Sequence, residues 1–139
     1  MKYAIVYSSM TGNTAALADK LHDILSEEDC VYFGDTAQYP QDSGADLVFI
    51  GFWTDKGSCD DTTRVFLKSL RNTNVVLFGT ASYADPDYIK GILKNAESDI
   101  PVSNTVLPGF VCQGRIGLSH PDEKDFEALK TWAEDFIHE

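Results

Sequence analysis

Short apolar runs alternate with amphipathic helical patterns from one end of this 139-residue sequence to the other. Strands are predicted at residues 3–7, 30–33, 46–51, 75–79 and 106–112, the last interrupted by Pro108–Gly109. Because β-α units of this length form parallel sheets with helices on both faces, the sequence predicts one α/β domain over residues 1–139.

Helices are expected after most of these strands. The second is predicted to start near Asp60–Thr62, and the third begins at Asp85–Pro86, a typical cap followed by a proline in the first turn. The last carries an apolar stripe at helical spacing that includes Trp132. We therefore expect Trp132 in the core rather than in a ligand site.

The net charge of −11 makes nucleic acid an unlikely class of partner, because phosphate backbones are bound by basic surfaces. An acidic surface can steer docking onto a partner protein with a basic surface, or simply keep the chain in solution. The apolar run 47–53 is too short to cross a bilayer, and the N-terminus lacks the pattern of a signal peptide. We expect no membrane association and a cytoplasmic location.

Three cysteines, Cys30, Cys59 and Cys112, are widely spaced and odd in number. Their spacing matches no zinc or iron–sulfur site, so we expect no metal and reduced, mostly buried thiols.

Ligands of parallel α/β sheets bind beyond the carboxyl ends of the strands, which directs attention to loops starting at Ser8, Phe52, Thr80 and Gln113. The first loop runs from Ser8 to Thr14 and carries several hydroxyls and one glycine ahead of a helix start. The unpaired N–H groups and the dipole of a helix N-terminus favour an anion. The alternative is a plain helix start, with Thr11 or Asn13 as the cap.

The first loop contains no Lys or Arg, so a bound phosphate would be held by neutral donors only. It also lacks the glycine patterns of dinucleotide and nucleoside-triphosphate sites. These absences favour a loop that anchors a cofactor through its phosphate.

Aromatic residues in the second and third loops suggest a flat ring as the rest of that cofactor. Trp53 at a strand end could cover one face of the ring, and Gly57 would permit a backbone rearrangement beside it. Tyr83 could flank the other face, with Tyr88 as its rival. The alternatives are an ordinary turn with a half-buried Trp and, for the fourth loop, a glycine-rich connection.

Residues 6–21 resemble the N-terminal signature of the flavodoxin family. The β-α order is similar, over essentially the whole chain, to the flavodoxin three-layer sandwich with a five-stranded parallel sheet of order 2-1-3-4-5. The resemblance implies flavin mononucleotide (FMN), with its phosphate on the first loop and its ring between the second and third loops. The candidate cofactor-binding residues are Ser8, Ser9, Met10, Thr11, Gly12, Asn13, Thr14, Phe52, Trp53, Thr54, Asp55, Lys56, Gly57, Thr80, Ala81, Ser82, Tyr83 and Tyr88.

The third loop departs from the acidic, aromatic loop usual in this family, which leaves the second stacking residue open. The second loop and residues 110–114 resemble a subgroup of small flavodoxin-like proteins of anaerobic bacteria, some of which accompany a dedicated reductase. The expected function is electron transfer to a partner reductase, with no catalytic residue of the protein's own. The alternatives are a small FMN-dependent NAD(P)H oxidoreductase and a cofactor-free interaction module with the same fold.

Overall fold

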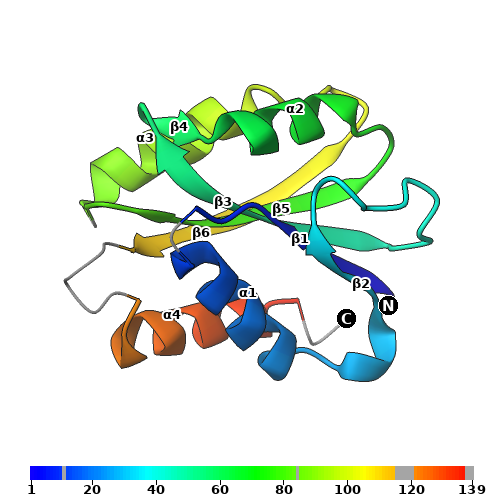
Figure 1. The fold of residues 1–139 in the computed structure, drawn as a ribbon, viewed down its shortest axis with the longest axis horizontal. Coiled ribbons are helices and arrows are strands. Elements are labelled where there is room, and N and C mark those ends of the chain that lie inside the picture. Colours follow the sequence, from blue (N-terminus) through cyan, green and yellow to red (C-terminus); the bar gives the residue numbers. More distant parts are fainter. Residues whose placement is uncertain (11, 84, 115–120, 137–139) are drawn as a thin grey trace.

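The computed structural model describes residues 1–10, 12–83, 85–114 and 121–136 (Figure 1). The strands are β1 (Tyr3–Tyr7), β2 (Cys30–Asp35), β3 (Leu47–Asp55), β4 (Ser58–Cys59), β5 (Asn74–Ala81) and β6 (Thr105–Gln113). The helices are α1 (Asn13–Ile24), α2 (Asp61–Ser69), α3 (Pro86–Glu97) and α4 (Glu123–Glu134), with a short 3₁₀ helix η1 at Glu27–Asp29.

The main strands form a parallel sheet in the order β2-β1-β3-β5-β6, and the short β4 pairs antiparallel with the end of β3. Leaving out β4, this is the predicted order 2-1-3-4-5, so the predicted fold is confirmed. From β1 the sheet grows in one direction to β2 and in the other direction to β3, β5 and β6. The point of reversal lies between β1 and β3, and parallel α/β sheets bind ligands at such a point.

Four strands, β2, β3, β5 and β6, are longer than predicted. β3 continues to Asp55 because Lys56 and Gly57, with φ of 53° and 78°, form a tight turn that returns the chain as β4. β6 passes through Pro108–Gly109 without a break, and its pairing with β5 shifts register between Val76 and Phe78. A proline is tolerated there because β6 lies at the edge of the sheet.

Figure 1 shows α1 and α4 on one face of the sheet and α2 and α3 on the other. Side chains alternate between these faces along each strand. Ile5 and Phe49 pack with the α1/α4 side, whereas Val6, Ile50 and Phe52 pack with the α2/α3 side. Trp132 is half-buried and packs on the α1/α4 side, so the prediction that it belongs to the core is confirmed.

The helix starts follow from their capping residues. Asp60 accepts the N–H of Thr63 at the start of α2, and Asp85 accepts the N–H of Tyr88 at the start of α3, as predicted. α1 instead begins after Gly12, whose φ is 90°. The alternative of Asn13 as its cap is wrong because Asn13 is already the first helical residue. Thr11, the other candidate cap, lies outside the described residues.

The three cysteines are unbridged; Cys59 and Cys112 are buried, and Cys30 is half-buried. Across the described ranges, no helix combines the length and apolar character needed to span a bilayer.

Candidate functional site

The carboxyl ends of β1, β3, β5 and β6 lie together along one border of the sheet, called here the carboxyl edge (Figure 1). Direct contacts join the loops that follow these strands. Thr14 in α1 contacts both Phe52 on β3 and Thr80 on β5. Gln113 donates its side-chain amide to the carbonyl of Ser82 at 3.1 Å. The structure therefore brings together the described parts of the loops predicted to form the site.

The first loop is held against α1 by Ser9. Its Oγ accepts the N–H of Gly12 at 3.1 Å and the N–H of Ala15 at 3.3 Å. Neither bond uses the Ser9 hydroxyl proton, and among the described residues none accepts it, so this hydroxyl can donate to an anion. Apart from its neighbours in the chain, no described residue lies within 4 Å of the position that a Cβ on Gly12 would take, and Met10, two residues earlier, is 67% exposed. This open, neutral cradle at a helix start fits a phosphate group.

The hydroxyls of Ser8 and Thr14 are used within the protein. Ser8 Oγ donates to Asp60 Oδ2 at 2.9 Å. Thr14 is buried, and its hydroxyl donates to the Phe52 carbonyl at 3.1 Å and lies 3.2 Å from the hydroxyl of Thr80. Both side chains tie loops together, and the Ser8 N–H also donates to the Gly51 carbonyl at 3.0 Å. The backbone N–H of Thr14, in the first turn of α1, is therefore the better candidate for a ligand contact.

The second loop separates its residues between the two faces of the sheet. Phe52 is fully buried among the side chains on the α2/α3 side. The alternation along β3 places Trp53, which is half-buried, and Asp55 on the opposite face, which α1 covers. Of the two aromatic side chains in this loop, Trp53 is therefore the one on the face covered by α1, the helix that follows the first loop. Thr54 falls on the α2/α3 side, where its buried hydroxyl has no partner among the described residues.

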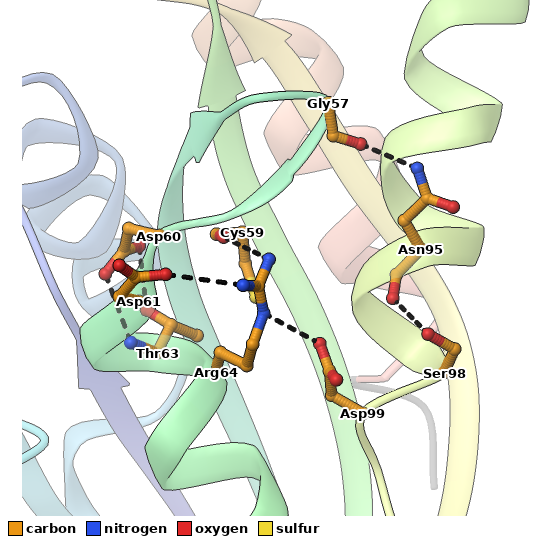
Figure 2. A network of polar contacts seen from close by, with 9 residues as sticks. All are labelled: Gly57, Cys59, Asp60, Asp61, Thr63, Arg64, Asn95, Ser98 and Asp99. Atoms are coloured by element: carbon orange, nitrogen blue, oxygen red, sulfur yellow. Dashed lines mark hydrogen bonds and ion pairs between the residues drawn. The ribbon is translucent and has the colours of Figure 1, made fainter.

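The turn of the hairpin is braced from α2 and α3 (Figure 2). Asn95 on α3 donates its side-chain amide to the Gly57 carbonyl at 2.8 Å. Arg64 on α2 donates to the Cys59 carbonyl at 3.5 Å and pairs with Asp61 and Asp99 at 3.3 and 3.2 Å. Ion pairs at the surface contribute little alone, but together these contacts tie Gly57 and Cys59 of the hairpin to α3 and α2.

In the third loop, Thr80 and Ala81 are buried and Ser82 and Tyr83 are exposed. The rings of Tyr83 and Tyr88 meet edge to face with centroids 6.2 Å apart and are 59% and 37% exposed. Both Tyr83 and its rival Tyr88 therefore lie next to each other at the carboxyl edge of the sheet.

Asp60 is a site residue that sequence reasoning treated only as a helix start. It is 1% exposed and contacts the ends of β1 and β3 as well as α2. Its neighbour Cys59 is not a candidate nucleophile, because burial raises the pKa of its thiol to about 11 and keeps it protonated at neutral pH.

The flavodoxin domain model matches residues 4–119 of the chain, a range that includes every candidate site residue. The chain belongs to the flavodoxin family. It is 39% identical over 132 residues to the flavodoxin-like domain-containing protein BilS of Clostridium symbiosum, covering 84% of this chain and 70% of the relative. It is 38% identical over 119 residues to the protein of the same name in Clostridioides difficile, covering 84% of this chain and 68% of that relative.

Solved flavodoxins have the same fold at low sequence identity. The flavodoxin of Streptococcus pneumonia TIGR4 superposes with a TM-score of 0.71 at 20% identity, covering 96% of each chain. Flavodoxin 2 of Bacillus cereus superposes with a TM-score of 0.70 at 19% identity, covering 98% of this chain and 97% of that one. An NADH:FMN oxidoreductase in its apo form has a TM-score of 0.67 at 16% identity, covering 99% and 89%.

Flavodoxin-type domains typically bind a flavin such as FMN. Membership of the flavodoxin family therefore supports a flavin-type redox role for this chain in general terms.

Proposed function

We propose that the protein binds FMN at the carboxyl edge of its sheet and transfers electrons to a partner reductase. The observation that carries this proposal is the first loop. It combines a Ser9 hydroxyl proton that no described residue accepts, a Gly12 Cβ position with no described residue near it beyond its chain neighbours, and the N-terminus of α1, with no basic residue in its sequence. Such a loop suits a phosphate that anchors a cofactor rather than one that reacts.

The residues divide by the part of FMN that they would hold. The Ser9 hydroxyl and backbone N–H groups of the first loop and the start of α1 would hold the phosphate, and Trp53 and Tyr83 or Tyr88 would cover the ring. When bound, FMN supplies the electron-transfer chemistry, and the protein positions it and limits its exposure to water. Ring stacking of this kind contributes roughly 0.5–1.5 kcal/mol beyond the burial of surface.

The partner would be a protein with a basic docking surface, because the net charge of −11 favours encounters with such surfaces. We place the carrier in the cytoplasm, where such a reductase would meet it.

The absorbance spectrum of the purified protein tests this function directly. We expect the yellow spectrum of a bound flavin, either as purified or after addition of FMN, and weaker binding of riboflavin, which lacks the phosphate. A colourless protein that takes up no FMN would refute the proposal and favour an interaction module. Rapid bleaching of bound flavin by NADH or NADPH alone would favour a free-standing reductase.

A further inference from the structure

Asp60 is a buried carboxylate that joins three elements of the site. Oδ2 accepts the hydroxyl of Ser8 at 2.9 Å and the N–H of Thr63 at 3.1 Å. Oδ1 accepts the N–H of Trp53 at 3.2 Å and the hydroxyl of Thr63 at 2.9 Å. Figure 2 shows its position at the start of α2, beside the end of the hairpin.

Capping α2 does not account for this arrangement. Asp85 caps α3 with a single hydrogen bond from Tyr88, and its side chain is exposed. Asp60 is 1% exposed, and no cation of the described residues pairs with it. Burying a charge without a counter-ion is costly, and four donors offset that cost. Two of the four donors belong to the candidate site: the hydroxyl of Ser8 is in the first loop, and the N–H of Trp53 is in the second.

We propose that Asp60 is a positioning residue that fixes the end of β1 relative to Trp53 and thereby couples phosphate binding to ring binding. This inference rests on the proposed FMN function. FMN joins its phosphate and its ring covalently, so both contacts form together only if the two loops keep a fixed separation. The hydrogen bond from Ser8 to Asp60 joins residues 52 apart in the sequence, and Asp60 in turn accepts the N–H of Trp53. Together with the backbone bond from the Ser8 N–H to the Gly51 carbonyl at 3.0 Å, this bridge sets the separation.

The negative charge of Asp60 and its positioning role have opposite expected effects on FMN affinity, so the sign of the change distinguishes them. A carboxylate near an anion site weakens anion binding, so its removal alone would strengthen FMN binding. If Asp60 acts by position, its removal weakens FMN binding despite the lost repulsion.

Asp60→Ser is the variant of choice, because serine still caps a helix but is too short to bridge Ser8 and Trp53. Dissociation constants are measured by flavin fluorescence for FMN and for riboflavin, and inorganic phosphate is tested by its effect on the melting temperature. We expect FMN affinity to fall roughly tenfold, about the loss of one charge-assisted hydrogen bond. Riboflavin affinity falls less, and the phosphate effect is unchanged.

Ser8→Ala removes one arm of the bridge and keeps Asp60. We expect it to lower the ratio of FMN to riboflavin affinity in the same direction without changing the phosphate effect. Asp122→Ser is the matched control, since it makes the same substitution at the cap of α4 and Asp122 is not a candidate site residue; its affinity ratio should equal that of the wild type.

Two outcomes would overturn the inference: an unchanged ratio of FMN to riboflavin affinity in Asp60→Ser, whether or not both affinities fall, or a loss of the phosphate effect itself. If Asp60→Ser does not fold, the ratio in Ser8→Ala decides. A wild-type protein that binds no FMN refutes the proposed function instead, so the two failures are distinct.

Discussion

At the scale of single residues, the backbone at Gly12 determines what the first loop can accommodate. Its φ of 90° is strained for most L-residues, while among the described residues beyond its chain neighbours none lies within 4 Å of where a Cβ would be. Asparagine tolerates such angles better than other residues. We predict that Gly12→Asn folds but binds FMN at least tenfold more weakly, roughly 1.4 kcal/mol, because its side chain takes the place of the phosphate.

Gly44 offers a matched control for that substitution. It has a φ of 81°, equally open surroundings, and a place in the connection between β2 and β3, away from the candidate site. Gly44→Asn should cost the same backbone strain, about 1–2 kcal/mol, and leave FMN affinity unchanged. Equal FMN affinity in both variants, measured by fluorescence titration, would show that the phosphate does not sit at Gly12.

Thr14 belongs to the predicted site, but its hydroxyl serves the fold. Thr14→Val keeps the shape of the side chain and leaves the Phe52 carbonyl without its donor. We predict a loss of about 1–3 kcal/mol in the free energy of unfolding in urea and an FMN affinity within about twofold of the wild type. Thr14→Ser should restore most of the stability. A large loss of FMN affinity with normal stability would instead place the hydroxyl on the phosphate.

At the scale of elements, close packing between β3 and β5 leaves no room for a methyl group at Gly51. A Cβ there would lie 2.5 Å from the ring of Phe78 and 2.9 Å from Cβ of Tyr7. We predict that Gly51→Ala lowers the free energy of unfolding by about 1–3 kcal/mol. Gly91→Ala, on α3 with open space around it, should raise it by about 0.4–1 kcal/mol. A Gly51→Ala variant as stable as the wild type in urea would contradict this account of the interface.

The elements also show what the sequence could and could not predict. The strand order and the edge that carries the site were predictable, because apolar runs separated by helices leave few parallel arrangements. The β3–β4 hairpin was not, because its turn is Lys56–Gly57 rather than the Asn-Gly or Asp-Gly that mark such turns. The bridge at Asp60 was not predictable either, since Ser8 meets it only after the sheet has formed.

At the scale of the whole molecule, acidic charge is concentrated on one helical layer. Residues 13–29 and 122–135, which include α1, η1 and α4, hold eleven acidic and three basic side chains. Residues 60–71 and 85–99, which include α2 and α3, hold six acidic and five basic ones. Among these helical segments, the excess of acidic over basic side chains is therefore larger on the α1/α4 side, the side to which Trp53 belongs.

This charge should act on the reduction potential of a bound flavin. Adding electrons to a ring in a negative environment is unfavourable, so we predict a last reduction step at a lower potential than that of free FMN, measured by potentiometric titration. Salt screens such charges, and the potential should rise with ionic strength. A potential equal to or above that of free FMN would contradict the electrostatic argument.

The proline within β6 has a consequence for the protein at high concentration. Pro108 has no N–H, and its carbonyl accepts the indole N–H of Trp132 at 2.9 Å. At this position the exposed border of the sheet offers neither a donor nor an acceptor to a strand from another molecule. Pro108, which interrupts the apolar pattern of the last strand, thus disfavours edge-to-edge aggregation.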